Sequence, residues 1–143
     1  MAEQKSCCTI LMAEDDPDDR IIVEHAFLEI GGKWDLRFVD DGEELMHYLL
    51  RTKNYADPLL SPRPEFILLD LNMPKKDGRQ ALSEIKADPD LREIPIVIWT
   101  TSKELRDKVQ CEETGAEFYI TKPGGYADLI NVLRKLISRY CFE

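Results

Sequence analysis

Basic residues are in the minority in this 143-residue sequence, which has 19 lysines and arginines against 28 aspartates and glutamates and a net charge of −9. Proteins that bind duplex nucleic acid or an anionic membrane surface need basic side chains to pair with phosphates. No apolar run approaches the roughly 20 residues that span a bilayer, and residues 1–6 lack the pattern of a signal peptide. We therefore expect a protein of the cytoplasm that binds neither nucleic acid nor a membrane.

Cysteine pairs of the kind that bind zinc are also absent. The four cysteines are Cys7, Cys8, Cys111 and Cys141, and none of them forms a C-x-x-C pair. Cys7 and Cys8 are adjacent in a strand-like run, so their side chains should point to opposite faces. We expect no zinc site, and we expect the thiols to be reduced, as is usual in the cytosol.

Apolar segments of strand length alternate five times with helical patterns, which is typical of repeated βα units that form a parallel sheet. The chain has no repeat, low-complexity tract or linker, so we expect a single domain over residues 1–143 without an output domain. Residues 52–64 contain three prolines and predict a loop. The predicted strands are 7–13, 34–39, 65–70, 95–100 and 117–121, and the predicted helices are 17–30, 44–51, 79–88, 103–114 and 126–140.

Polar side chains follow four of these strands. Glu14 and Asp15 come after the first strand, Asp70 ends the third, Thr100 ends the fourth and Lys122 follows the fifth. In open parallel sheets, ligands bind at the carboxyl ends of the strands. Acidic groups, a hydroxyl and an ammonium group at one edge are what a divalent cation and a phosphoryl group require together.

The residue types indicate how such a site would work. Mg²⁺ prefers oxygen ligands and keeps several waters, so the carboxylates of Asp15 and Asp70 with the backbone carbonyl of Asn72 would suffice. A carboxylate can also act as a nucleophile and form an aspartyl phosphate. Lys122 would then neutralise the phosphoryl oxygens, and the Thr100 hydroxyl would donate a hydrogen bond to one of them.

At these positions the sequence resembles the receiver domains of two-component response regulators. The similarity covers residues 8–140 and rests on four segments in the family's order. It implies a flavodoxin-like, three-layer α/β/α fold with a five-stranded parallel sheet in the order 2-1-3-4-5. The long loop before Glu65 and the sequences of two segments, N-M-P-K-K-D-G and I-W-T-T-S, are similar to those of single-domain receivers that partner phytochrome-type histidine kinases. The four segments are E-D-D (14–16), I-L-L-D-L-N-M-P-K-K-D-G (67–78), I-W-T-T-S (98–102) and Y-I-T-K-P (119–123).

The resemblance implies a role for each residue at the acidic end of the site. Asp70 matches the phosphoacceptor, which takes a phosphoryl group from the phosphohistidine of a sensor kinase. Asp15 matches the acid that ligates Mg²⁺, Glu14 the neighbouring acid that holds a metal-bound water, and Asn72 the residue whose carbonyl is a ligand. The protein would thus be a phosphoacceptor in signalling and not an enzyme with a separate substrate.

The resemblance also implies how the phosphoryl group would be sensed. Lys122 matches the lysine that pairs with the phosphoryl group, Thr100 the hydroxyl that moves toward it, and Tyr119 the aromatic residue that turns inward at the same time. The change would reach the surface formed by residues 103–114, 117–121 and 126–140. Ser102 falls where the family tunes hydrolysis of the phosphoryl group, and the bond between Lys122 and Pro123 is usually cis in the family.

The downstream partner would be a protein, and a second copy of the chain is one candidate. Three aromatic residues near the C-terminus, Tyr126, Tyr140 and Phe142, are left over once the apolar stripe of the last helix is assigned to the core. These residues motivate the hypothesis of a homodimer.

Other classes of protein fit the same residues less well. A phosphatase of the haloacid dehalogenase type has a second acid two residues after its nucleophile, where this sequence has Asn72, and its nucleophile follows the first strand. A flavin carrier needs a hydroxyl-rich loop after the first strand, which is acidic here, and the G-x-x-x-x-G-K of a P-loop enzyme is absent. Simpler interpretations stay open at single positions: Asp15 as a helix cap and Tyr119 as a core aromatic.

Overall fold

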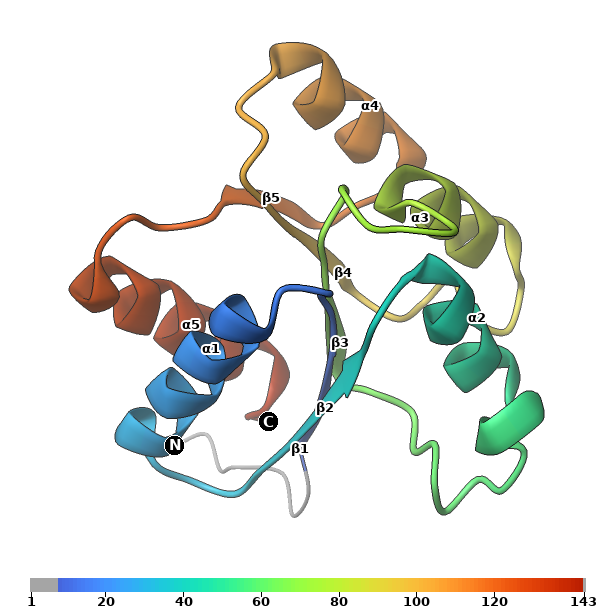
Figure 1. Cartoon of the computed structure of the whole chain (residues 1–143), viewed down its shortest axis with the longest axis horizontal. Helices are drawn as coiled ribbons and strands as arrows, with labels where there is room; N and C mark the ends of the chain where they lie inside the picture. Colours follow the sequence, from blue (N-terminus) through green and yellow to red (C-terminus); the bar gives the residue numbers. More distant parts are fainter. Residues whose placement is uncertain (1–7, 143) are drawn as a thin grey trace.

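The computed structural model describes residues 8–142, in which five parallel strands form one sheet in the order β2-β1-β3-β4-β5 (Figure 1). The predicted strand order and three-layer fold are therefore confirmed. The elements in chain order are β1 (Cys8–Ala13), α1 (Pro17–Ile30), β2 (Trp34–Val39), α2 (Gly42–Leu50), the 3-10 helix η1 (Lys53–Tyr55), β3 (Phe66–Leu69), α3 (Gly78–Ala87), β4 (Ile96–Thr100), α4 (Leu105–Thr114), β5 (Phe118–Thr121) and α5 (Tyr126–Tyr140).

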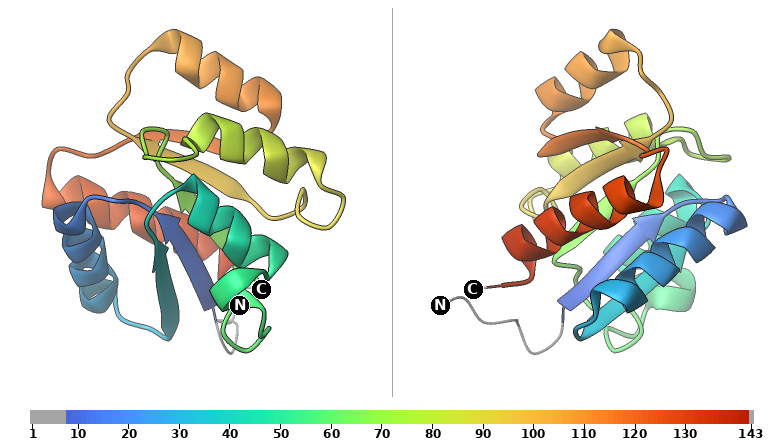
Figure 2. Two further views of the ribbon diagram at one scale, coloured as in Figure 1. Left: turned by 45° about the vertical axis from the view of Figure 1, so that its right-hand side comes forward. Right: turned by 90° about the vertical axis from the view of Figure 1, so that its left-hand side faces the viewer.

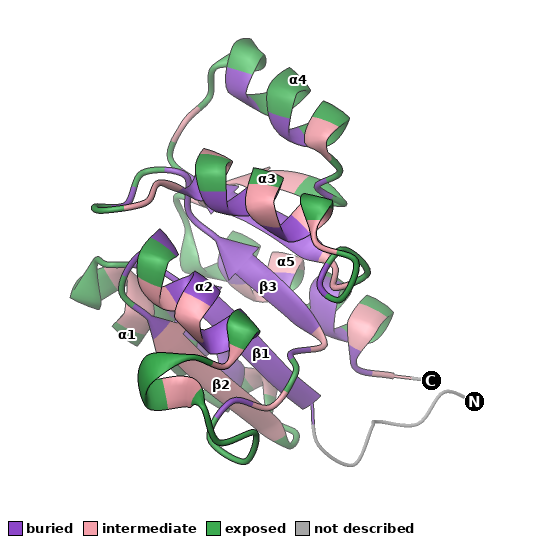
Figure 3. Ribbon diagram, turned by 90° about the vertical axis from the view of Figure 1, so that its right-hand side faces the viewer, coloured by how far each residue is buried: buried purple, intermediate pink, exposed green. Residues whose placement is uncertain are grey.

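Helices cover both faces of the sheet. Helices α1 and α5 pack on one face, and α2, α3 and α4 pack on the other (Figures 1 and 2). The strands alternate between the two cores, so that Leu11 and Ala13 of β1 lie under α2–α4 while Ile10 and Met12 lie under α1 and α5. Every residue of β3 is buried (Figure 3), as expected of a central strand covered on both sides.

Acidic residues begin three of the helices, as the sequence indicates for α1. The Asp16 carboxylate accepts a hydrogen bond from the Asp18 amide, and Pro17 takes the first helical position. Asp41 caps α2 and Asp77 caps α3 in the same way. These caps fix the point at which the chain leaves the carboxyl edge of the sheet.

The predicted loop at 52–64 is more ordered than its prolines suggest. It contains η1, whose Tyr55 hydroxyl donates a 2.6 Å hydrogen bond to Glu44 of α2. The Tyr48 hydroxyl donates another, of 2.6 Å, to the carbonyl of Pro62. Side chains of α2 thus hold the loop, which the prolines alone do not predict. Helix α4 also starts at Leu105, two residues later than predicted.

The expectation of reduced thiols is wrong for two cysteines. Cys8 at the start of β1 and Cys141 after α5 form a disulfide with their Cα atoms 5.6 Å apart, and neither is exposed. They are 133 residues apart in sequence, and only the fold brings them together. Cys111 is free and buried, while Cys7 lies outside the described residues.

Two further expectations meet the structure here. None of the peptide bonds in the described residues is cis. The Lys122–Pro123 bond is therefore trans, and the cis bond implied by the resemblance is not present. Within residues 8–142, no helix combines the length and the apolar character needed to cross a membrane.

Candidate functional site

The backbone places the polar residues at the carboxyl edge of the sheet. The hydrogen-bond ladder continues one residue beyond three strands: the Glu14 amide donates to Val39, the Asp70 amide to Ala13 and the Lys122 amide to Thr100, at 3.1, 3.2 and 2.8 Å. Residues held in this way have little freedom to shift along the sheet. The side chains predicted to act together are therefore fixed on neighbouring strands.

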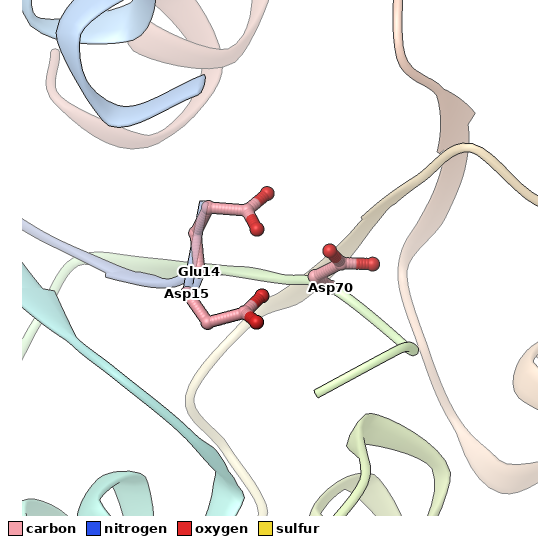
Figure 4. A group of neighbouring side chains, drawn as sticks. All are labelled: Glu14, Asp15 and Asp70. Atoms are coloured by element: carbon pink, nitrogen blue, oxygen red, sulfur yellow. The ribbon is translucent and has the colours of Figure 1, made fainter. Parts of the chain in front are cut away.

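Three of these side chains form an acidic cluster. One oxygen from each of Glu14, Asp15 and Asp70 lies within 4.8 Å of the other two. Glu14 and Asp15 extend from the end of β1 toward the side on which Asp70 lies (Figure 4). Asp15 is exposed, whereas Glu14 and Asp70 are buried. Converging carboxylate oxygens of which one is open to solvent suit a hard divalent cation.

The Lys122 ammonium group lies among carboxylates from three elements. Its Nζ is 2.6 Å from Glu14 Oε1, 2.7 Å from Asp19 Oδ2 and 3.2 Å from Asp70 Oδ2. Burial alone would lower the pKa of Lys122, but the hydrogen bonds to Asp19 and Glu14 outweigh it and raise the pKa. Lys122 is therefore a permanent positive charge beside Asp70.

Glu14 is the most buried acid of the cluster, with a side chain that is 1% exposed. Its burial, which outweighs the hydrogen bond from Lys122, raises its pKa to about 7. Glu14 Oε2 also accepts a 3.2 Å hydrogen bond from the Asp16 amide. Both of its oxygens are thus in use within the protein, unlike the exposed carboxylate of Asp15.

Asp70 is held from two sides. Its Oδ1 accepts a 3.2 Å hydrogen bond from the Asn72 amide, and its Oδ2 faces Lys122. Its backbone also lies against the start of α3, where a Cβ atom on Gly78 would come within 2.1 Å of the Asp70 carbonyl oxygen. Gly78 is therefore required for the close approach of α3 to the end of β3.

Thr100 and Tyr119 meet at a third residue, Ser102. The Thr100 hydroxyl is buried at the end of β4 and accepts a 3.3 Å hydrogen bond from the Ser102 amide. The Tyr119 hydroxyl donates a 3.0 Å hydrogen bond to the Ser102 carbonyl. Burial raises the pKa of this hydroxyl, so it stays a donor at neutral pH. Tyr119 is partly buried against the α2–α4 core, which fits the core interpretation as well as the switch interpretation.

An ion pair connects the loop after β4, which contains Ser102, to α3 and α4. The Arg79 guanidinium donates two hydrogen bonds of 2.8 Å to Asp107, and the Ser102 hydroxyl donates a third of 2.7 Å to the same carboxylate. The hydrogen bonds from Arg79 and Ser102 lower the pKa of Asp107 to about 2. We call these three residues the Arg79–Asp107–Ser102 clasp.

The structure brings together Glu14, Asp15, Asp70 and Lys122 as the sequence predicts, and it places Asn72 beside Asp70. Sequence reasoning missed Asp19 and the clasp. Asp19 and Asp18 both look like acids that favour a helix N-terminus, and only the structure singles out Asp19. Arg79 and Asp107 are 28 residues apart and carry no motif.

Comparison with known proteins confirms the class. Residues 10–134 match the response regulator receiver domain. The response regulator Rcp1 of Synechocystis sp. is 38% identical over 129 residues, which cover 90% of this chain and 86% of that protein. Two solved structures, the phosphorylated cyanobacterial phytochrome response regulator RcpA and the Mn²⁺-bound form of Rcp1, each cover 94% of this chain and are covered to 94%. Their TM-scores are 0.86 and 0.83, at 34% and 37% identity.

The parallel sheet, with acids, a threonine and a lysine at its carboxyl edge, agrees with the receiver domain that the family model matches. The chain belongs to the response regulator receiver domain family, and it is homologous to the phytochrome response regulators. The predicted class and function are thereby confirmed: this is a receiver of two-component signalling.

Proposed function

We propose that Asp70 is the phosphoacceptor of this receiver. The observation that carries the proposal is its position within the acidic cluster. Glu14 is fully engaged by Lys122 and the Asp16 amide, and Asp15 is exposed on the side of the cluster open to solvent. Asp70 combines membership of the cluster with a contact to Lys122, and both of its hydrogen bonds are long at 3.2 Å. It is the buried carboxylate that can most easily exchange its partners.

In the transfer, an Asp70 carboxylate oxygen attacks the phosphorus atom of a kinase phosphohistidine. An O–P bond forms as the P–N bond breaks, and the histidine nitrogen leaves with the electron pair and is protonated. Lys122 pairs with the phosphoryl oxygens as their charge comes to lie beside it. The Asn72 amide, 3.2 Å from Oδ1, orients the carboxylate.

Mg²⁺ is the divalent ion that we propose for the cluster. Asp15 and Asp70 would hold it together with the backbone carbonyl of Asn72, and Glu14 would hold one of its waters. The converging oxygens within 4.8 Å fit such an ion, and the Mn²⁺-bound form of Rcp1 supports a divalent metal in this family. When bound, the ion supplies positive charge that offsets the charge of the phosphoryl oxygens.

The signal would leave the site through Thr100 and Tyr119. Both residues contact Ser102, and the Ser102 hydroxyl donates to Asp107 of α4. A shift of the Thr100 hydroxyl toward a phosphoryl oxygen would therefore disturb the Ser102 amide and change the position of α4. The affected surface is the one formed by α4, β5 and α5, which would then bind a partner with altered affinity.

The phosphoryl donor that we propose is a sensor histidine kinase of the phytochrome type. The similarity to Rcp1 and to RcpA, a phytochrome response regulator, supports this. The similarity extends over most of both relatives, since the chain covers 86% of Rcp1 and 94% of RcpA. The protein would work in the cytoplasm and assist its own phosphorylation and slow dephosphorylation without acting on another substrate.

A homodimer is part of the proposal, but two of the three aromatic residues suggested by the sequence are packed against the core and are not free to form its surface. The Tyr140 ring packs on Phe66 at 5.2 Å, and Phe142 is partly buried against the α1/α5 core. Tyr126 at the start of α5 remains exposed, and Phe118 of β5 is a further exposed apolar side chain on the surface formed by α4, β5 and α5. Sedimentation with and without a phosphoryl mimic tests this, and a monomer under both conditions would contradict it.

The phosphoacceptor is tested by incubation with acetyl phosphate and Mg²⁺. We expect the protein to gain the mass of one phosphoryl group, and the label to be released by hydroxylamine, which cleaves acyl phosphates. Asp70→Asn should gain none. Asp18→Asn, which removes an exposed acid from α1, should label like the wild type. Equal labelling of Asp70→Asn would refute the assignment.

A further inference from the structure

A phosphoryl group at the site would compete with the three present partners of Lys122 for its ammonium group. An ammonium group has three N–H donors, and Glu14, Asp19 and Asp70 take all three in this structure. A phosphoryl group on Asp70 would need at least one of them. One of the present partners must therefore give way when the site is phosphorylated.

Asp19 is the partner that can leave at the lowest cost. The Glu14 side chain is 1% exposed, so an unpaired Glu14 would be a buried charge without compensation. Asp70 carries the incoming group and cannot withdraw. The Asp19 side chain is 32% exposed on α1, and it can turn to water when the ammonium group moves away.

We propose that Asp19 is a positioning residue that draws the Lys122 ammonium group away from Asp70 in the unphosphorylated protein and releases it to the phosphoryl group. The inference rests on the proposed function of Asp70. The distances support it, since Nζ lies at 2.7 Å from Asp19 and at 3.2 Å from Asp70. The Lys122 ammonium group thus lies closer to the carboxylate on α1 than to the phosphoacceptor.

The direction of the effect follows from this arrangement. Without the Asp19 charge, the ammonium group is less restrained and can pair earlier with the oxygens of an arriving phosphodonor. Phosphorylation should therefore become faster. A charge-assisted hydrogen bond in a partly exposed pair is weak enough that the gain should be about three- to tenfold.

Asp18 provides a matched control. It is the neighbouring residue in the same first turn of α1, it is exposed, and it has the same charge. Asp18→Asn and Asp19→Asn remove one negative charge each and change the helix N-terminus alike. Only Asp19→Asn removes a contact with Lys122.

The experiment measures the rate of phosphorylation by acetyl phosphate with saturating Mg²⁺. We expect Asp19→Asn to react about three- to tenfold faster than Asp18→Asn, and Asp19→Glu, which keeps the charge, to react at nearly the wild-type rate. Thermal unfolding of the variants checks that they are equally folded. Equal rates for Asp18→Asn and Asp19→Asn, a slower Asp19→Asn, or a fast Asp19→Glu would each overturn the inference.

Salt distinguishes the hold on Lys122 from simple repulsion of the phosphodonor by Asp19. At about 1 M salt the Debye length is near 3 Å, so repulsion over a longer distance is screened while a direct contact persists. The advantage of Asp19→Asn should survive at this concentration, and its disappearance would overturn the inference. A wild-type protein that is not labelled at all would instead refute the role of Asp70.

Discussion

At the scale of single residues, the site is dominated by the balance of one ammonium group against several carboxylates. Lys122 is 14% exposed and Glu14 1%, so each charge depends on the other for compensation. A buried ion pair is strongly destabilising to break by removal of one partner, because the other charge is left alone. Lys122, which we propose as the partner of the phosphoryl group, thus also stabilises the unphosphorylated fold.

Lys122→Ala should therefore lower the free energy of unfolding by about 3 kcal/mol, which urea denaturation measures. Without Lys122, the pKa of Glu14 should rise beyond its present value of about 7. A raised carboxyl pKa means that the folded state binds a proton that the unfolded state lacks, so stability falls as the pH rises. The loss should be larger at pH values above 7 than below.

The control for this variant is Lys75→Ala. Lys75 lies 3.8 Å from Asp41 and its side chain is 64% exposed, so its loss should cost less than about 1 kcal/mol. Mg²⁺ should restore part of the stability of Lys122→Ala, since a cation in the cluster compensates the same acids. Equal losses for the two lysine variants would contradict the account.

The positions at strand ends could be predicted from the sequence because the backbone alone determines them. A residue that follows a parallel strand lies at the carboxyl edge whatever its neighbours are, and this rule found Asp15, Asp70 and Lys122. Asp19 and Asp107 could not be found in this way. Their contacts depend on how far a helix is rotated against the sheet, and that is set by the packing of the core.

At the scale of secondary-structure elements, the clasp is the feature that joins the proposed switch residues, Thr100 and Tyr119, to a helix. Asp107 is buried at the first turn of α4, and its partners lie on α3 and in the loop after β4. Helix α4 presents few buried residues to the core, namely Asp107 and Cys111. The hydrogen bonds of the clasp are therefore a large part of the interactions that hold α4 in position.

Asp107→Asn should lower stability by about 1–3 kcal/mol at neutral pH. Arg79 and Ser102 lower the pKa of Asp107 from its ordinary value of 3.8 to about 2. A carboxyl group with a lowered pKa contributes stability that is fully present above its unfolded pKa and is lost as the pH falls through its folded pKa. The difference between wild type and variant should thus be constant above pH 4 and shrink toward pH 2.

Urea midpoints measured across this pH range test the prediction. Glu104→Gln removes a neighbouring acid whose side chain is 64% exposed, and it should leave the change in stability between pH 4 and pH 2 as it is in the wild type. If Asp107→Asn and Glu104→Gln lose stability equally, the clasp does not position α4.

The elements themselves were predicted well where periodicity and capping agree. Pro17 and the glycines after α1 mark the ends of that helix through backbone preferences that act locally, whereas α2 begins at Gly42, two residues before its predicted start. The 3-10 helix η1 was missed because it is held by the side chains of Tyr55 and Tyr48, which contact Glu44 and the Pro62 carbonyl. Such contacts depend on the fold as a whole and leave no local pattern.

At the scale of the whole molecule, the two ends of the described chain meet on the α1/α5 face of the sheet. β1 lies inside the sheet between β2 and β3, and α5 packs across that face so that its last turn comes back to the start of β1. Cys8 and Cys141 thereby become neighbours. Because the two cysteines are 133 residues apart, the sequence alone does not predict that they form a pair.

The Cys8–Cys141 disulfide closes nearly the entire described chain into one loop. In the chain-entropy account, a crosslink stabilises by restricting the unfolded state, and the effect grows with loop length. We expect Cys141→Ser to lower the free energy of unfolding by about 2–4 kcal/mol in non-reducing buffer. Mass spectrometry of peptides from the unreduced protein should find Cys8 joined to Cys141.

A reducing agent separates the crosslink from the loss of a buried side chain. It should destabilise the wild type but leave Cys141→Ser unchanged, so that the two proteins converge under reduction. Because neither sulfur-bearing residue is exposed, reduction of the folded protein should be slow and should accelerate in mild denaturant. Since the site lies at the opposite end of the strands from Cys8, phosphorylation of Asp70 should proceed equally in both redox states. A wild type that is indifferent to reductant would contradict the crosslink.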